Sequence, residues 1–100
     1  MKLGIMATRD SFKKQLLGIV RSASSRGHEV IVFLTDDGVN LCLDSEFQQL
    51  IGHPGVTMSL CDHSAKLRDI SEADVPAGVV QGSQFQNAVM NQDADKVIVI

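Results

Sequence analysis

Residues 29–35, "EVIVFLT", contain an unbroken run of apolar and β-branched side chains from Val30 to Leu34. A strand with one face in water alternates apolar and polar residues, so an unbroken run indicates a strand that is covered on both faces, as in a parallel sheet. Parallel neighbours cannot be joined by a tight turn, and they need crossover connections that are usually helices. The run therefore predicts a layered fold in which helices cover both faces of a sheet.

The rest of the chain alternates between strand and helix patterns, as such a fold requires. Besides 29–35, strands are predicted at residues 2–7, 56–61, 78–80 and 95–100, the last of them buried. Helices are predicted at residues 11–27, 43–55, 62–69 and 82–92, with a turn at 36–40. We therefore expect one α/β domain over residues 1–100, a three-layer α/β/α sandwich around a mostly parallel sheet of about five strands with right-handed crossovers.

Polar residues that favour helix N-termini precede three of the predicted helices. Thr8 or Asp10 is the expected cap of the first helix, and Asp44 or Ser45 is the expected cap of the second. Ser83 opens an S-x-x-Q capping box before the last helix. These caps set the expected starts of the three helices.

Composition argues against two classes of partner. The chain has 9 Lys and Arg against 12 Asp and Glu, and its cations are scattered, so it lacks the clustered positive charge that binds phosphate backbones. It has no Trp or Tyr for stacking on bases. The first apolar run meets Arg9 and Asp10 and is too short for a signal sequence or a membrane span. We therefore expect no nucleic-acid partner and no membrane association.

The cysteines indicate a reducing compartment. Cys42 and Cys61 are 19 positions apart and no CxxC pair is present, a pattern that predicts reduced thiols in a cytoplasmic protein. Cys42 lies between Leu41 and Leu43 and is interpreted as a core residue. Cys61 and His63 lack a second pair of ligands nearby, and no glycine-rich phosphate loop is present, so we expect neither a metal nor an organic cofactor.

Cys61 is the residue best placed for chemistry. Ligands of open parallel sheets bind beyond the carboxyl ends of the strands, and Cys61 ends a predicted strand where a helix begins. Backbone N–H groups at a helix N-terminus lower a thiol pKa and favour the reactive thiolate. His63 and Arg68 would add electrostatic support, whereas the Asp62 carboxylate opposes it. Two interpretations remain open here: a nucleophile, and a buried core thiol, which the local sequence favours.

Three stretches in the same order resemble the DsrE-like sulfur-relay family, which includes DsrE, DsrF and TusD. They are "FLTDDGV" at 33–39, "LCDHSAKLRDI" at 60–70 and "GSQFQNAVM…ADKVIVI" from 82 to 100, and the resemblance covers essentially the whole chain. It implies a small α/β fold of flavodoxin-like topology and a homo-oligomer, either a trimer or a hexamer. It also implies that Cys61 accepts sulfane sulfur as a persulfide and passes it to a partner thiol without a cofactor.

Two other functions remain open at this point. A non-catalytic oligomeric scaffold needs a self-associating apolar face, for which residues 38–43 and 85–90 are candidates. A small-ligand-binding protein would use a crevice near Thr8, Asp36 and Ser83. Whether the chain is an enzyme, as a sulfurtransferase would be, is therefore open, and the residues name neither a sulfur donor protein nor an acceptor protein.

Overall fold

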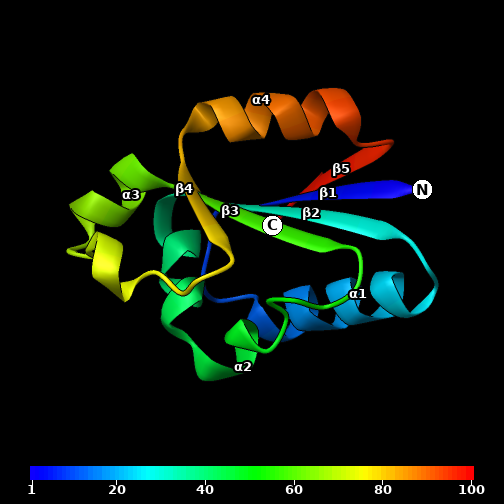
Figure 1. The fold of residues 1–100 in the computed structure, drawn as a ribbon, viewed down its shortest axis with the longest axis horizontal. Coiled ribbons are helices and arrows are strands. Elements are labelled where there is room, and N and C mark those ends of the chain that lie inside the picture. The colour runs from blue at the N-terminus through cyan, green and yellow to red at the C-terminus, as the bar shows by residue number, and fades with distance from the viewer.

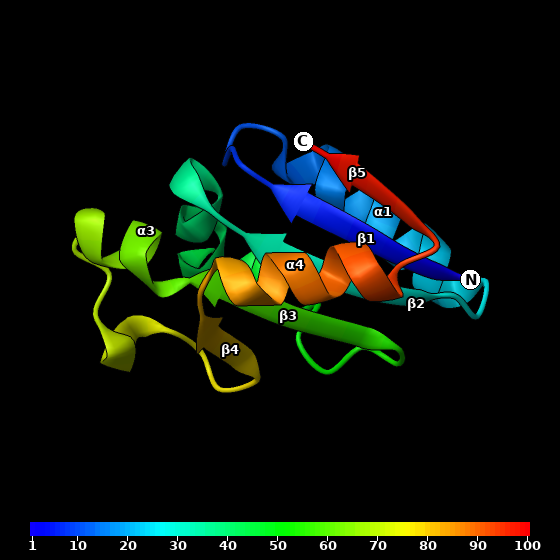
Figure 2. The ribbon, with the colours of Figure 1, turned by 90° about the horizontal axis from the view of Figure 1, so that it is seen from above.

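Five parallel strands form the sheet at the centre of the computed structural model, which describes residues 1–100 (Figure 1, Figure 2). The strands are β1 (Lys2–Ala7), β2 (Glu29–Leu34), β3 (Val56–Cys61), β4 (Val79–Gly82) and β5 (Lys96–Val99). Their order across the sheet is β4-β3-β2-β1-β5, and every neighbouring pair is parallel. The predicted α/β class and the predicted number of strands are confirmed.

Helices cover both faces of this sheet. Helix α4 (Gln84–Asp93) lies on one face, and α1 (Lys13–Ser25) and α2 (Ser45–Gln48) lie on the opposite face (Figure 1). Helix α3 (Asp62–Leu67) lies beyond the end of β3, and the 3-10 helices η1 (Asp36–Leu43) and η2 (Glu72–Asp74) complete the connections. The three predicted layers are therefore present. None of these helices is both long enough and apolar enough to cross a lipid bilayer.

The strand order differs from that of flavodoxin. Strands β1 to β4 follow one another across the sheet, and the crossover through α4 then returns the chain to the far edge beside β1. In the flavodoxin order, 2-1-3-4-5, the first strand lies between the second and the third. The expected flavodoxin-like topology therefore holds for the layers and the parallel sheet, but not for the order of the strands.

Strand β2 is buried on both faces, as its unbroken apolar run predicts. Val30, Val32 and Leu34 are fully buried in the main core, on the side of α1 and η1. Phe33 is also fully buried but packs with Cys61 and Met90 in a second, smaller cluster. Because Met90 belongs to α4, this second cluster lies on the face that α4 covers. The last residue of β3 is thus anchored beneath α4.

Strand β5 is an edge strand, and the prediction of a buried strand there is wrong. It pairs only with β1, so one side of it has no neighbour. Val99 is 63% exposed, and Val97 and Ile98 are only partly buried. The run of apolar residues gave no sign of this, because the position of a strand in the sheet depends on a crossover rather than on its own sequence. The predicted short strand at 78–80 is confirmed as β4, with slightly different bounds.

The predicted caps are right for two helices and wrong for one. Asp44 accepts hydrogen bonds from two backbone N–H groups of α2, and Ser83 forms the expected capping box with Gln86. Helix α1, however, has no side-chain cap. The Thr8 hydroxyl instead donates to the Ile100 carbonyl at 3.0 Å, and Asp10 accepts from the Asn40 side chain. The Thr8 side chain therefore binds the end of the chain after β5, and the Asp10 side chain binds η1, so neither caps α1.

Residues 38–43 are not an exposed interface. Val39, Leu41 and Cys42 are buried in the main core, and among the apolar residues of this stretch only Leu43 is exposed. The apolar character of η1 is explained by its packing under the sheet, because the same residues that looked available for self-association fill the core.

Candidate functional site

A cleft of about 670 Å³ opens where the carboxyl ends of β2, β3 and β4 meet. Three short segments line it: Thr35 and Asp36 after β2, Cys61–Ser64 together with Lys66 after β3, and Gly82–Phe85 after β4. Consecutive strands of a parallel sheet bring these segments to the same edge, although they lie far apart in the sequence. The cleft therefore occupies the position where ligands of open α/β sheets bind.

Cys61 lies at the junction of β3 and α3. It is the last residue of the strand, it pairs with Gly82 of β4, and it occupies the N-cap position of the helix. Its exposed fraction is only 5%, yet it lines the cleft. One side of Cys61 packs against Phe33 and Met90. The thiol is therefore held in place by the core and is reachable only through the cleft.

Hydrogen-bond donors around the sulfur control its protonation. Burial alone raises the pKa of the Cys61 thiol, but surrounding donors outweigh burial and bring the pKa below its ordinary value. The donors are the hydroxyl and backbone N–H of Ser64, the side-chain amide of Gln84 and the backbone N–H of His63. They stabilise the anion in particular, since a neutral thiol is a weak acceptor and makes no side-chain capping bond here. The site therefore stabilises the thiolate relative to that of an ordinary cysteine.

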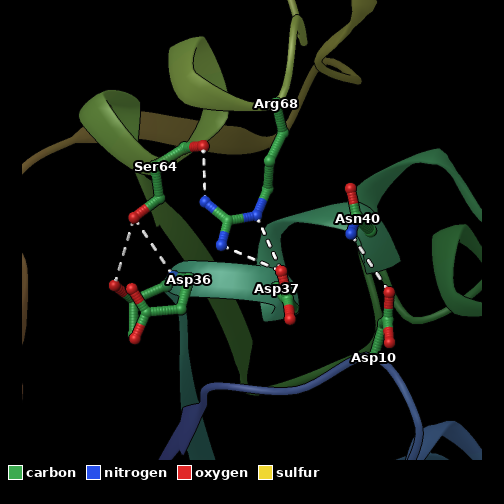
Figure 3. Close-up of polar contacts among 7 residues, drawn as sticks. Asp10, Asp36, Asp37, Asn40, Ser64 and Arg68 are labelled. Carbon is green, nitrogen blue, oxygen red and sulfur yellow. Dashed lines mark hydrogen bonds and ion pairs between the residues drawn. The ribbon is translucent and has the colours of Figure 1, made fainter.

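Two buried hydroxyl groups line the same cleft as Cys61. The oxygens of Thr35 and Ser64 are 3.5 Å apart, and the two residues are 3% and 5% exposed. The amide nitrogen of Gln84 donates to the Thr35 hydroxyl at 3.3 Å, and the backbone N–H of Asp36 donates to the Ser64 hydroxyl at 3.1 Å. Asp36 has a φ of 50°, in the left-handed region that non-glycine residues rarely adopt, and this conformation accompanies the bond to Ser64 (Figure 3).

Arg68 does not line the cleft, and its side chain instead contacts α3 and η1. Its guanidinium group donates to the Ser64 carbonyl at 3.1 Å and forms an ion pair with the Asp37 carboxylate at 2.9 Å (Figure 3). Asp37 thereby ties η1 to the end of α3. The positive charge of Arg68 is used in this contact, so the structure gives it a positioning role rather than the expected electrostatic role at the sulfur.

The other predicted site residues divide between the cleft and the rest of the molecule. His63, Asp36 and Ser83 line the cleft, as expected of a shared crevice. Thr8 does not line it, because β2 separates β1 from β3 and the Thr8 hydroxyl is bonded to the Ile100 carbonyl. The Ser83 hydroxyl accepts from the backbone N–H of Phe85 in the capping box.

The lining of the cleft carries two carboxylates and one ammonium group. Lys66 forms an ion pair with Asp62 at 2.9 Å, one helical turn away, and these are two of the charged side chains of the lining. Asp36 adds a negative charge, and the lining contains no arginine. No group of three or more His, Cys, Asp or Glu side chains is placed to bind a metal ion. The nucleophile in the lining is the Cys61 thiol, together with the donors that surround it.

Cys42 has the opposite environment. It is fully buried in the main core, and its thiol forms no disulfide. Burial, with a smaller contribution from the Asp74 carboxylate, raises the pKa of the Cys42 thiol. A thiol that is protonated and inaccessible does not act as a nucleophile. The interpretation of Cys42 as a core residue is therefore confirmed, and the contrast between the two cysteines is built into the fold.

Three uncharged polar residues that line the cleft were not singled out from the sequence: Thr35, Ser64 and Gln84. A signal for Ser64 was present, because it stands three residues after Cys61 in the first turn of the predicted helix, where side chains and backbone N–H groups face the N-cap residue. Thr35 and Gln84 gave no comparable signal. They meet Ser64 only because β2 and β4 flank β3 in the sheet.

Comparison with known proteins places the chain among small α/β proteins. The model of the DsrE/DsrF-like family matches residues 1–100. The crystal structure of the ychN protein from E. coli superposes with a TM-score of 0.75 at 19% identity, covering 99% of this chain and 97% of that one. MTH1491 from Methanobacterium thermoautotrophicum, a protein of unknown function, superposes with a TM-score of 0.74 at 17% identity, covering 99% and 98%. No curated protein sequence matches the chain.

Proposed function

Because the chain belongs to the DsrE/DsrF-like family, which is associated with sulfur relay, we propose that it is a sulfur carrier or sulfurtransferase that forms a persulfide on Cys61. The observation that supports this most is the environment of Cys61: a thiol whose pKa is lowered, at the bottom of a cleft at the carboxyl edge of the sheet. The proposed substrate is sulfane sulfur carried on a donor thiol, and the partners are a donor protein and an acceptor protein. The two unpaired cysteines fit a reducing, cytoplasmic setting.

Transfer on Cys61 takes two exchanges of the same kind. The Cys61 thiolate attacks the outer sulfur of a donor persulfide, R–S–SH, so that the donor S–S bond breaks and R–S⁻ leaves as a thiolate. Cys61 is then a persulfide, Cys61–S–SH. An acceptor thiolate attacks its outer sulfur, the new acceptor S–S bond forms, and the Cys61 thiolate leaves. No net oxidation or reduction occurs, and each step converts one thiolate and one persulfide into another such pair.

The donors around Cys61 assist both steps. In the first step they stabilise the ionised sulfur, which is the form that attacks. In the second step Cys61 is the leaving group, and a thiolate with a low pKa leaves faster. The same Ser64 and Gln84 groups therefore serve the attack and the release, because the charge returns to the same atom. The mixed charge of the cleft, with Lys66 neutralised by Asp62, places no strong demand on the charge of the donor.

Intact mass spectrometry after incubation with glutathione persulfide tests the proposal. The wild-type chain should gain one sulfur atom, and the gain should disappear on treatment with a reducing thiol. Cys61→Ser should gain none, whereas Cys42→Ala, a matched control at the buried cysteine, should load like the wild type. Sulfur loading that is equal in Cys61→Ser and the wild type would exclude Cys61 as the carrier.

We also propose that the chain forms a homo-oligomer through the side of α4. Val80, Phe85 and Val89 are exposed to 55%, 68% and 38%, and they line a groove of about 340 Å³ between α4 and strands β3 and β4. Exposed apolar residues that gather in one groove favour association. Multi-angle light scattering measures the mass in solution, and a monomer at micromolar concentration would contradict this part of the proposal. An oligomer without sulfur loading would favour the scaffold function.

A further inference from the structure

The buried hydroxyl groups of Thr35 and Ser64 can orient their two protons in two ways. The Thr35 oxygen accepts from the Gln84 amide, and the Ser64 oxygen accepts from the backbone N–H of Asp36. The Gln84 amide is oriented by a second contact, since its oxygen accepts from the side-chain amide of Asn87 at 3.3 Å. Both hydroxyl oxygens are therefore already acceptors, and each hydroxyl still has one proton to donate.

Only one of these two protons can lie between the two oxygens. If Thr35 donates to Ser64, the Ser64 proton is free to point at Cys61, whose pKa responds to the Ser64 hydroxyl. If Ser64 donates to Thr35, the Thr35 proton has no acceptor among the hydrogen bonds of the structure. A buried hydroxyl proton without an acceptor is costly. The first arrangement is therefore the stable one when Cys61 is a thiolate.

We propose that Gln84, Thr35 and Ser64 form a hydrogen-bond chain with one direction, running from the Gln84 amide through both hydroxyl groups to the sulfur of Cys61. Ser64 is the last member of this hydrogen-bond chain, and its hydroxyl is one of the donors that stabilise the Cys61 thiolate. Thr35 is a positioning residue that orients the Ser64 proton and polarises it, because donors in a chain strengthen one another. Gln84 donates to Thr35 and also acts on the sulfur directly. This inference rests on the proposed function in taking Cys61 as the reacting atom, and it assigns roles to three residues from the neighbouring strands and helices.

One substitution distinguishes the two directions of the hydrogen-bond chain, because it changes the rate of Cys61 alkylation in opposite senses. Thr35→Val keeps the shape of the side chain and removes its hydroxyl group. If Thr35 donates to Ser64, the variant weakens the donor at Cys61, and alkylation of Cys61 at pH 7 should slow by about twofold. If the chain ran the other way, Thr35→Val would release the Ser64 proton to Cys61, and alkylation would become faster. Ser64→Ala removes the hydroxyl that ends the hydrogen-bond chain and should slow alkylation roughly tenfold, as expected for one hydrogen bond to an ionised acceptor.

The experiment is iodoacetamide alkylation of the full chain as a function of pH, followed by mass spectrometry of the peptide that contains Cys61. The buried Cys42 is an internal check of folding, since its peptide remains unmodified as long as the core is closed. Thr57→Val on the exposed part of β3 is the matched control and should leave the pH profile unchanged. Gln84→Met, at an exposed position, keeps the core intact and should also slow alkylation, because it removes both the bond to Thr35 and the direct effect of the amide on the sulfur.

The double variant completes the test. Because Thr35 acts through Ser64, Thr35→Val should add nothing to Ser64→Ala, and the two effects should not sum. Three results would each contradict the proposed hydrogen-bond chain: faster or unchanged alkylation in Thr35→Val, unchanged alkylation in Ser64→Ala, or additive effects in the double variant. These results are independent of sulfur loading. The expected pH response without sulfur loading would contradict the proposed function but support the hydrogen-bond chain. Sulfur loading without the expected pH response would support the proposed function but contradict the hydrogen-bond chain.

Discussion

Gly38 lies in η1 beside the end of β1, where the structure leaves no room for a side chain. A Cβ atom at this position would lie 2.7 Å from the carbonyl carbon of Ala7, closer still to the Ala7 oxygen, and 3.3 Å from the nitrogen of Thr8. All three are backbone atoms, so no change of rotamer relieves the contact. Gly38→Ala must therefore push η1 away from β1 or displace the end of the strand.

The displaced carbonyl of Ala7 is hydrogen-bonded to a residue that lines the cleft. The Ala7 oxygen accepts a hydrogen bond from the backbone N–H of Thr35 at 3.0 Å, and Thr35 is buried. Overpacking costs about 1–3 kcal/mol and a lost buried hydrogen bond about 1 kcal/mol, so the free energy of unfolding should fall by about 2–4 kcal/mol. For a urea slope of about 1.5 kcal/mol/M, the unfolding midpoint should fall by roughly 1–3 M.

Urea titration followed by circular dichroism measures this loss. Gly18→Ala is the matched control, because Gly18 is exposed inside α1 and a Cβ atom there meets nothing within 4 Å. Alanine is favoured over glycine in a helix by up to about 1 kcal/mol, so the control should be slightly more stable than the wild type. The two substitutions should therefore have opposite signs. A Gly38→Ala variant that unfolds at the wild-type urea concentration would refute the packing between η1 and β1.

Three further predictions concern pH, access and the ion pair behind the site. The backbone N–H of Phe47 and other donors hold the pKa of Asp44 below its usual range, so its contribution to stability is present above the unfolded pKa and is lost as pH falls through the folded pKa; thermal melts on the acid side should show this slope, and Asp44→Asn should flatten it. Methyl methanethiosulfonate should modify Cys61 much faster than a bulky aromatic disulfide, because the residue is 5% exposed; equal rates in stopped-flow assays would contradict a thiol reached only through the cleft. Arg68→Ala should lower the free energy of unfolding by about 1 kcal/mol, whereas Arg21→Ala on the exposed side of α1 should have little effect; equal urea midpoints would argue against the contact to α3.

The class of fold could be predicted because each element carries its own local signal. The unbroken run in β2 indicated a strand covered on both faces, and Ser83 with Gln86 marked the start of α4. Such signals depend on neighbours in the sequence. The exposure of β5 had no signal of this kind, since Val97 to Val99 have the composition of a buried strand and are half-exposed only because the strand pairs with β1 alone.

The site could be predicted in part for the same reason. The position of Cys61 follows from the end of one strand and the start of one helix, both of which are local. The exclusion of Thr8 from the cleft depends on the order of the strands, and so does the meeting of Thr35 with Gln84, which are 49 positions apart. Arg68 was expected to support the sulfur electrostatically because it follows Cys61 closely in the sequence. Its ion pair with Asp37 depends on the packing of η1 beside α3, which the sequence does not show.

Transfer of labelled sulfur shows whether Cys61 carries sulfur from a donor to an acceptor. Glutathione persulfide carrying heavy-isotope sulfane sulfur is mixed with catalytic amounts of the chain and with an excess of a peptide thiol as acceptor, and the label in the acceptor is followed by mass spectrometry. The wild type and Cys42→Ala should speed the appearance of label over the uncatalysed exchange, whereas Cys61→Ser should not. Label that reaches the acceptor equally fast with Cys61→Ser would contradict a carrier role for Cys61.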